Sequence, residues 1–219
     1  LNITLDRKIL LKRTSIKTIN KLLEENPNWN VLDIGCGYTA NKFANTVADA
    51  QDLSKFYEKK KFIQITEKKL PFKDNEFNFV ITSHVIEHVE DFEFFLKEIE
   101  RISHKGYIEL PSRLADNLVY ENLKDHIWWF KYNDIEQSLI ISKKNQLIEP
   151  FITVSMAKKL EEIFRESLIM DFIWENKIDY QIDEDLEERD KEKVSFSKLI
   201  RKYISKKIRN FLRKSKKLR

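Results

Sequence analysis

The sequence predicts an α/β protein in which a doubly wound, mostly parallel sheet carries helices on both faces. Two observations support this fold class. Short, almost continuous apolar runs recur along the chain, as in strands that are buried on both faces. The first run leads into a turn that holds two of the only three glycines in 219 residues, Gly35 and Gly37. The predicted strands are residues 29–34, 46–50, 62–66, 77–82 and 107–110.

The composition fits one globular domain with an attached tail. A chain of 219 residues with 42% hydrophobic residues can bury a sizeable core. No stretch is long and apolar enough to cross a bilayer, and no secretory signal is recognised after Leu1. The single cysteine, Cys36, excludes an internal disulfide and a multi-cysteine zinc site. We therefore expect a cytoplasmic protein.

Charge divides the chain into two parts. Residues 193–219 hold 12 of the 40 lysines and arginines and no acidic residue, which leaves 28 basic against 36 acidic side chains elsewhere. An acidic body with a basic tail indicates two units. We expect one domain over residues 1–182 and a charged linker with a tail helix over residues 183–219.

The glycine turn and the residues around it predict a ligand site. A buried strand that leads into a Gly-x-Gly turn opens many nucleotide-binding α/β units, although a purely structural turn gives the same pattern. Asp33 lies two residues before Gly35, and Ala40 stands where a dinucleotide-binding fold has its third glycine. An acidic residue at this place suits a cationic or hydroxyl-bearing ligand better than a pyrophosphate.

The run Val-Leu-Asp-Ile-Gly-Cys-Gly at 31–37 resembles motif I of the class I S-adenosylmethionine-dependent methyltransferases, which have a Rossmann-like fold. The resemblance implies that S-adenosylmethionine is the cofactor and that the turn of Gly35, Cys36 and Gly37 wraps its methionine part. It also implies that Asp33 helps to hold the amino group of the cofactor. Cys36 is interpreted as a small space-filling residue rather than a nucleophile.

The resemblance also implies contacts to the ribose and the adenine. Residues 38–45 are too few for a full crossover helix, so we expect one helical turn or an irregular loop. An acidic residue at the end of the second strand would bind the ribose hydroxyls. Asp49 is the candidate, Asp52 is the second choice, and a plain loop aspartate is the alternative. Near the adenine, the family usually has an aspartate; here Thr66 stands at that position, and Glu67 follows it.

Two further runs extend the resemblance to about residue 112. Ser-His-Val-Ile-Glu-His-Val at 83–89 resembles the family segment that leaves the fourth strand and crosses the cofactor, which implies cofactor contacts for Ser83 and His84. Gly-Tyr-Ile-Glu-Leu-Pro-Ser at 106–112 resembles the fifth strand, with Gly106 in the turn before it. Both runs are similar to a small bacterial-type branch that is often linked to glycan and cell-envelope biosynthesis.

His84 and His126 are the candidates for a catalytic general base, which is needed where the acceptor is a poorly acidic hydroxyl. Neither position is fixed by spacing, and a histidine at a strand end is often a hydrogen-bonded structural residue. His84 and His88, four residues apart, raise the question of a metal ion. No cysteine cluster and no clear third ligand accompany them, so we predict no metal site.

Beyond the fifth strand we expect an aromatic segment and additional hairpins. The run Asp-His-Ile-Trp-Trp-Phe at 125–130 either covers the substrate pocket or forms a packed lid without a chemical role. Residues 139–148 are predicted to form one β-hairpin and residues 172–182 a second hairpin or long strand pair.

Apolar spacing predicts three helices in the body of the chain. A leading helix is expected over 6–25, a second follows residues 90 and 91 to residue 102, and a third covers 155–166. The apolar residues expected to face inward are Phe92, Phe95, Leu96 and Ile99 in the second helix and Met156, Leu160, Ile163 and Phe164 in the third.

The tail is predicted to form a helix with one apolar face and one face of lysine and arginine. A basic amphipathic helix suits an anionic membrane surface or a partner groove. Such a tail would hold the protein at the inner face of the membrane. Docking on the acidic body of its own or a neighbouring chain is the alternative, and binding of nucleic acid is less favoured.

These features predict a methyltransferase that moves the sulfonium methyl group of S-adenosylmethionine to a hydroxyl, or an amine, of a small-molecule or saccharide acceptor. One alternative is a catalytically decayed binding or scaffold protein on the same fold. The other is an RNA methyltransferase that grips RNA with its tail. The acidic body, and the lack of an Asn/Asp-Pro-Pro-Tyr/Phe motif in the sequence, speak against a nucleic-acid enzyme.

Overall fold

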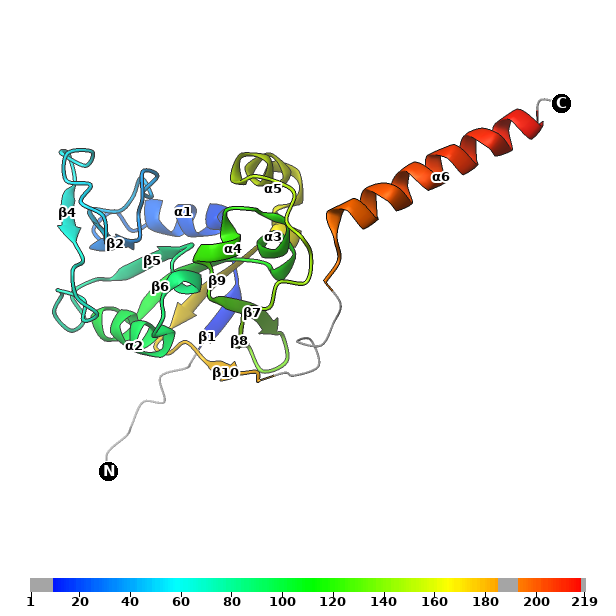
Figure 1. The fold of residues 1–219 in the computed structure, drawn as a ribbon. Helices are drawn as coiled ribbons and strands as arrows, with labels where there is room; N and C mark the ends of the chain where they lie inside the picture. The colour runs from blue at the N-terminus through cyan, green and yellow to red at the C-terminus, as the bar shows by residue number, and fades with distance from the viewer. Residues whose placement is uncertain (1–9, 185–192, 218–219) are drawn as a thin grey trace.

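The computed structural model describes residues 10–184 and 193–217, the last four by their backbone alone. Its centre is a seven-stranded sheet with the order β1-β9-β6-β5-β2-β3-β4 (Figure 1). The strands from β6 to β4 run parallel, whereas β9 is antiparallel to both of its neighbours. The strands are β1 Leu10–Arg13, β2 Val31–Ile34, β3 Thr46–Asp49, β4 Lys61–Gln64, β5 Phe79–Ser83, β6 Lys105–Pro111 and β9 Ile169–Glu175.

Both faces of this sheet are covered, because successive side chains of a strand point to opposite faces. Val31 belongs to the core layer that contains helix α1 (Ile16–Glu24). Its neighbour Leu32 belongs to the layer that contains helix α2 (Phe92–Ile102). The predicted doubly wound, mostly parallel α/β fold is confirmed.

An irregular loop stands between β2 and β3 in place of a crossover helix, as predicted for residues 38–45. Tyr57 holds this loop: its hydroxyl donates to the Gly37 carbonyl (2.8 Å) and accepts from the Ala40 amide (3.1 Å). Lys60 donates from Nζ to the Ala44 carbonyl at the other end of the loop. Hydrogen bonds from one buried tyrosine and one lysine therefore fix the backbone of this loop, as the hydrogen bonds of a helix would in a longer crossover.

The chain leaves β5 through His84 and one short 3-10 helix, η1 (Ile86–His88), before α2 begins. Asp91 caps α2 by accepting a hydrogen bond from the Phe94 amide (3.2 Å). The helix predicted to end at residue 102 is confirmed. The four apolar residues expected to face inward, Phe92, Phe95, Leu96 and Ile99, are all buried.

A second sheet of three strands has the order β10-β8-β7. β7 (Trp128–Asn133) and β8 (Ser138–Lys143) form an antiparallel hairpin, and β10 (Tyr180–Ile182) adds to β8 in parallel. Both hairpins predicted from the sequence are therefore wrong. Residues 146–148 do not form a strand, and β9 and β10 lie in different sheets. Burial against distant strands decides these pairings, and local turn patterns do not report it.

The leading helix predicted over 6–25 is wrong in its first described part. Residues 10–13 form β1, whose Leu11 is buried and stands opposite Trp174 of β9. The helix itself begins at Ile16. Pairing with a strand about 160 residues away gives this segment an extended form, which helical spacing cannot foresee.

Gly106 lies within β6 and not in the turn before it, so this prediction is also corrected. A Cβ at Gly106 would lie 2.6 Å from Nε1 of Trp174 and 2.4 Å from the Val80 carbonyl oxygen. The glycine is needed because the indole of Trp174 crosses the strand at this point.

Two short helices, α3 (Arg113–Leu118) and α4 (Asn122–Asp125), follow β6, and α5 (Val154–Leu168) lies beside α3. The helix predicted over 155–166 is confirmed, but its predicted inward face is wrong. Among the described elements, α5 packs mainly on α3 and β9, and most of its surface faces solvent. The exposed apolar residues are Met156, Leu160, Ile163 and Phe164, whereas Ala157 and Leu168 are buried.

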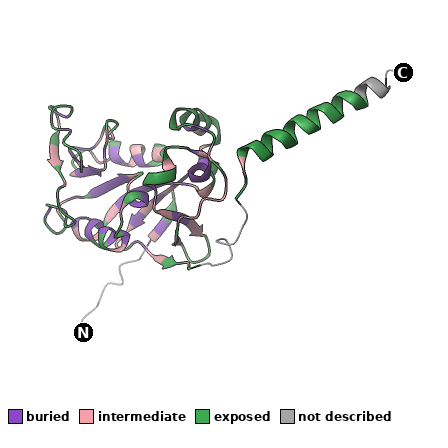
Figure 2. Cartoon of the chain, viewed as in Figure 1, coloured by how far each residue is buried: buried purple, intermediate pink, exposed green. Residues whose placement is uncertain are grey.

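The tail forms α6 (Phe196–Lys217), which extends away from the body (Figure 1) and is exposed along its described length (Figure 2). At its start, the ring of Phe196 stacks on Phe151, with centroids 5.0 Å apart. Most of the predicted linker after residue 183 lies outside the described residues. Within the described ranges, no helix combines the length and the apolar character that a membrane span requires.

Candidate active site

The glycine turn sits at the carboxyl end of β2, where ligands bind in open α/β sheets. Gly35 and Gly37 have φ angles of +67° and +46°, a backbone conformation that favours glycine. The Gly35 amide donates to the Ala48 carbonyl (2.8 Å), and the Gly37 amide donates to Oδ2 of Asp49 (2.9 Å). Asp49, the predicted ribose ligand, thus also fixes the turn.

Asp33 is buried beneath the turn, with its Oδ2 accepting a hydrogen bond from the Asn41 amide (2.7 Å). Burial raises the pKa of Asp33 to about 7, although this hydrogen bond and the charge of Lys60 lower it. Burial destabilises the ionised form of Asp33, and a cation bound next to the carboxylate would stabilise that form.

A first cavity of about 650 Å³ opens between the turn and the start of α2. Of the predicted cofactor residues, Gly35, Asp49, Glu67 and His84 line it. Apolar walls come from Ile34, Ile65, Leu70 and Val89. Thr66 is exposed and is not among the lining residues, and neither is Asp52.

A second cavity of about 470 Å³ lies on the other side of Gly35. The lining residues predicted from the sequence are Asp33, Gly35, Cys36, Gly37, Ser83 and His84. The cavity is more polar than the first and includes Glu109 and Arg165. The two cavities together hold every predicted cofactor residue except Thr66.

A third cavity of about 410 Å³ lies beyond the carboxyl end of β6, under α5. His126, the second predicted catalytic residue, lines it together with Glu121 and Asp125. Lys158 and Glu161 of α5 line both the second and the third cavities. Of all the lining residues, His84 alone is common to the three cavities.

His84 has a φ angle of +56°, which is unusual for a residue with a Cβ. Its Nδ1 lies 3.2 Å from Oε1 of Glu87, and its Nε2 lies 3.3 Å from Oε1 of Glu109. The side chain of His84 is 40% exposed, and its partial desolvation would lower the pKa of the ring, but the two carboxylates raise this pKa to about 10. A ring in this state donates from both nitrogens, so the predicted base role of His84 would require a different protonation state.

Glu109 connects His84 to a charge network that the sequence did not single out. Burial alone would raise the pKa of Glu109, but hydrogen bonds from His84 and Tyr107 and the charge of Arg165 lower it to about 2. Arg165 of α5 forms an ion pair with Glu109 and lies 3.6 Å from Asp171. The sequence does contain a signal that could have identified Glu109, because it is a glutamate within a largely apolar strand.

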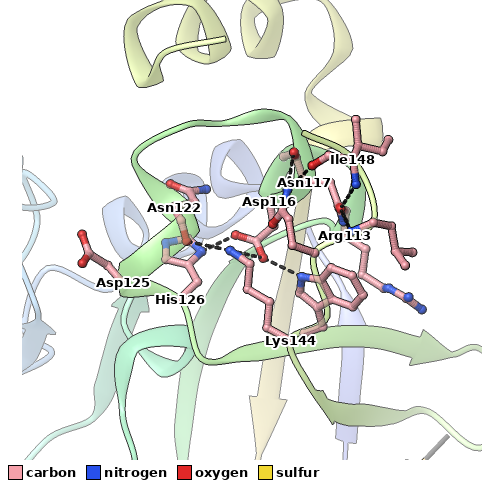
Figure 3. A network of polar contacts seen from close by, with 12 residues as sticks. Arg113, Asp116, Asn117, Asn122, Asp125, His126, Lys144 and Ile148 are labelled. Atoms are coloured by element: carbon pink, nitrogen blue, oxygen red, sulfur yellow. Dashed lines mark hydrogen bonds and ion pairs between the residues drawn. The ribbon is translucent and has the colours of Figure 1, made fainter. Parts of the chain in front are cut away.

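His126 belongs to a second buried network, shown in Figure 3. Its Nδ1 lies 2.5 Å from Oδ1 of Asp116, close enough for an ion pair although the ring is not aligned for a linear hydrogen bond. The other oxygen of Asp116 accepts from Trp129 (2.6 Å) and faces Nζ of Lys144 (3.2 Å). Burial lowers the pKa of Lys144.

The aromatic run at 125–130 takes part in both the site and the core. His126 lines the third cavity, whereas Trp129 and Phe130 are buried. Trp128 packs on Phe92 of α2, with ring centroids 4.8 Å apart. The segment is thus a packed wall of the cavity that presents two polar side chains to it, Asp125 and His126.

A parallel sheet whose strand ends open into adjoining cavities around a Gly-x-Gly turn defines an α/β protein that binds a nucleotide-like cofactor. Residues 32–108 match the family model described as "Methyltransferase domain". This segment contains β2 to β5 and the first part of β6, and with them most of the first cavity. Over these residues the chain is similar to methyltransferase domains, in agreement with the resemblance of its motifs, and this similarity supports S-adenosylmethionine as the cofactor.

The comparisons also give relatives of this chain. An uncharacterized protein of Methanocaldococcus jannaschii, MJ0638, is 34% identical over 116 residues, which are 49% of this chain and 51% of that protein. The chain thus spans about half the length of this curated relative.

Two solved structures show a weak similarity to this chain. The PH0226 protein from Pyrococcus horikoshii is 18% identical, with 74% of this chain and 89% of that chain covered and a TM-score of 0.43. An S-adenosylmethionine-dependent methyltransferase from Aquifex aeolicus is 13% identical, with 72% and 87% covered and a TM-score of 0.40. Likeness at this level carries no argument about the acceptor.

Proposed function

We propose that this chain transfers the methyl group of S-adenosylmethionine to a hydroxyl of a saccharide or another small hydroxylated acceptor. The observation that carries this proposal is the meeting of three cavities at His84. The first two contain the residues predicted to hold the cofactor. The third adjoins them and has its own polar lining, which suits an acceptor that must lie in line with the methyl group.

The reaction needs little covalent chemistry from the protein. The carbon–sulfur bond of the sulfonium breaks as the acceptor oxygen bonds to the methyl carbon, and the hydroxyl proton leaves. The protein must hold donor and acceptor in line and exclude water, and such positioning supplies on the order of 7–11 kcal/mol. Lys158 and Glu161, which line both the second and the third cavities, lie where the donor and acceptor sites join.

The lining of the third cavity supports a hydroxylated acceptor over RNA. Glu121, Asp125 and Glu161 bring three carboxylates, against one lysine, Lys158. Carboxylates accept hydrogen bonds from hydroxyl groups, and they repel the phosphates of a nucleic acid. Methylation of an RNA is therefore the less favoured outcome of the test below.

The test has two parts. Calorimetric titration with S-adenosylhomocysteine measures cofactor binding, and transfer of a labelled methyl group from S-adenosylmethionine is then measured with saccharide, amine and RNA acceptors. Glu161→Gln changes the third cavity, whereas Glu162→Gln changes the next residue of the same helix, which is exposed and pairs with Lys159. We expect Glu161→Gln to reduce transfer about 10-fold or more, and Glu162→Gln to leave both transfer and cofactor affinity unchanged.

Failure of the intact chain to bind S-adenosylhomocysteine would contradict the proposed enzyme and favour a scaffold protein. Transfer to RNA but to no saccharide would contradict the proposed acceptor. Equal activity of the two glutamate variants would show that the third cavity does not hold the acceptor.

We further propose that α6 binds an anionic lipid surface and brings the domain to a membrane. Several large apolar residues of α6 are more than a third exposed, and the described helix contains no acidic residue. This combination suits the boundary between lipid headgroups and acyl chains. The exposed apolar residues are Phe196, Leu199, Ile200, Tyr203, Ile204, Ile208, Phe211 and Leu212.

Co-sedimentation of the full chain with vesicles tests this. We expect binding to vesicles that contain phosphatidylglycerol, little binding to pure phosphatidylcholine, and weaker binding at high salt. The double variant Ile204→Ser/Ile208→Ser should lose most of the binding. Equal binding of this variant, or a dimer of the intact chain held together by α6, would contradict the proposal.

A further inference from the structure

We propose that Glu87, His88 and His126 bind a divalent transition-metal ion at the edge of the third cavity. Each of these residues offers one ligand atom, and the three atoms lie within 4.8 Å of one another. Glu87 and His88 come from η1, and His126 follows α4, so the fold joins parts of the chain that are about 40 residues apart.

Both histidines have one nitrogen engaged in a way that leaves the other free to bind a metal. Nδ1 of His88 lies 2.9 Å from the Asp125 carbonyl oxygen. A carbonyl oxygen only accepts, so Nδ1 carries the proton and the lone pair of the neutral ring is on Nε2. At His126 the contact is an ion pair: Nδ1 lies 2.5 Å from Oδ1 of Asp116 without hydrogen-bond alignment, and Nε2 is the nitrogen that the aspartate does not engage. The two rings meet edge to face, with centroids 4.5 Å apart.

Glu87 supplies the observation that points most directly to a cation. The residue is fully buried, with a relative exposure of 0%. Its Oε1 faces Nδ1 of His84, whereas Oε2 has no hydrogen-bond partner among the residues that the structure describes. A buried carboxylate oxygen without a partner is costly, and a bound cation would satisfy it.

The surroundings of His126 resemble the outer shell of a metal site. Metal-binding histidines usually donate their second nitrogen to a carboxylate or a carbonyl oxygen, which orients the ring and makes it a better ligand. Asp116 provides the carboxylate and is itself fixed by Trp129 and Lys144 (Figure 3). Lys144 also donates to the Asn122 carbonyl (2.6 Å). The aspartate therefore holds His126 in place from a rigid position.

Two imidazoles and one carboxylate favour Mn²⁺, Fe²⁺, Co²⁺, Ni²⁺ or Zn²⁺ over Ca²⁺ and Mg²⁺, which prefer oxygen ligands alone. Ligands about 2.1 Å from one ion stand about 3–3.5 Å apart. Separations of up to 4.8 Å between the ligand atoms must therefore shrink by as much as about 1.3–1.8 Å around the ion. Three protein ligands also leave positions open, and the cavity lined by His88 and His126 gives access to them.

This inference also extends the proposed function, and in that respect it rests on it. A metal ion beside the acceptor would lower the pKa of a coordinated hydroxyl and so promote loss of its proton. Both nitrogens of His84 face carboxylates. The ion would then perform the activation for which the sequence suggested a histidine base.

The test is titration of the full chain with Co²⁺ in the absence of cofactor, followed by the visible absorption of the bound ion. We expect one ion per chain. His88→Gln and His126→Gln should each weaken binding at least 10-fold, and Asp116→Asn should weaken it about 10-fold through the ring that it orients. His104→Gln, the same change at an exposed histidine on the far end of α2, should leave binding unchanged. Circular dichroism checks that each variant is folded.

Less than half an ion per chain, or the same affinity in His88→Gln, would overturn the inference. His88 is exposed, so its variant decides the matter if His126→Gln does not fold. Equal loss in His104→Gln would indicate adventitious binding to surface histidines and would also overturn it. Because no cofactor is present, Co²⁺ binding can fail while S-adenosylhomocysteine binds, and the reverse, so the metal site and the proposed function fail separately.

Discussion

Gly35 lies so close to Val85 that a Cβ on the glycine would stand 2.3 Å from Cγ2 of the valine. The two residues belong to different motifs, the glycine turn after β2 and the crossing segment after β5. Their contact brings these segments together between the first two cavities. Gly35 is therefore fixed twice, by its positive φ angle and by its neighbour.

Gly35→Ala should destabilise the protein by about 2–3 kcal/mol and abolish measurable binding of S-adenosylhomocysteine, because the added methyl group must displace Val85 or the turn. Gly37→Ala is the matched control, since a Cβ at Gly37 would have no atom within 4 Å and only the φ angle of +46° opposes the change. It should cost about 1 kcal/mol. Denaturant unfolding and calorimetry measure both effects. The double variant Gly35→Ala/Val85→Ala should recover part of the stability, and no recovery would show that the contact is unimportant.

Asp33→Asn should stabilise the protein without ligand at pH 8. The pKa of Asp33 is raised from 3.8 to about 7 in the folded state. The folded protein therefore binds a proton more tightly than the unfolded chain does, and its stability falls as the pH rises from about 4 to about 7. Asparagine removes this loss, which is about 4 kcal/mol at most from 1.36 kcal/mol per pKa unit. Urea unfolding at pH 4.5 and pH 8 should show a gain only at the higher pH, and an equal gain at both would contradict the raised pKa.

The same substitution should weaken cofactor binding. The resemblance predicts that Asp33 holds the cationic amino group, and only the ionised carboxylate does this well. Affinity of the unaltered chain for S-adenosylhomocysteine should therefore rise between pH 6 and pH 8, as the proton leaves Asp33. Asp33→Asn should bind about 10-fold or more weakly at pH 8 and should lose the pH dependence. A variant that keeps the pH profile would place the titrating group elsewhere.

Asp49→Asn should weaken S-adenosylhomocysteine binding by about 10- to 100-fold, equivalent to one or two hydrogen bonds to a charged group. The Asp49 carboxylate accepts from the amides of Gly37 and Gln51 and lines the first cavity. An amide side chain cannot keep all of these contacts. Asp52→Asn is the control, because Asp52 accepts hydrogen bonds from the nearby Ser54 in the described contacts and is not on the cavity wall. A larger effect at Asp52 than at Asp49 would reverse the assignment of the ribose ligand.

The sequence predicted the part of the fold in which local pattern and long-range packing agree. β2, β3 and β5 are apolar runs bounded by turn residues, and their burial on both faces leaves one arrangement, parallel and central. The glycine turn needs positive φ angles at two positions, and two glycines separated by one residue indicate this. Because the carboxyl ends of these parallel strands lie at one edge of the sheet, the strand order alone brings most of the predicted cofactor residues together.

The sequence was misleading where an element depends on a distant partner. β1 has helical spacing but pairs with β9. The apolar residues of α5 have the spacing of a buried face, yet most of them are exposed because few elements cover that helix. The grouping of Glu87 and His88 with His126 is of the same kind. It depends on how the segment after α4 returns to η1, where the Ile127 amide donates to the Glu87 carbonyl (2.7 Å).

Tyr57→Phe should loosen the glycine turn and leave the rest of the fold intact. The hydroxyl of Tyr57 is bonded to Gly37 and Ala40, and its ring stacks on Phe62 with centroids 6.3 Å apart. Phenylalanine keeps the ring and leaves the Gly37 carbonyl and the Ala40 amide without this partner. We expect a loss of about 1–3 kcal/mol in the free energy of unfolding and several-fold weaker binding of S-adenosylhomocysteine.

Tyr38→Phe is the matched control, because it also removes a tyrosine hydroxyl. Tyr38 lies in the loop that Tyr57 contacts, and it is 63% exposed. Its effect on stability should stay within about 0.5 kcal/mol. Hydrogen exchange gives a second measurement, since the Ala40 amide should lose protection in Tyr57→Phe and keep it in Tyr38→Phe. Unchanged protection of Ala40 in Tyr57→Phe would mean that Lys60 and the strand ends hold the loop, and that the tyrosine does not substitute for the missing crossover helix.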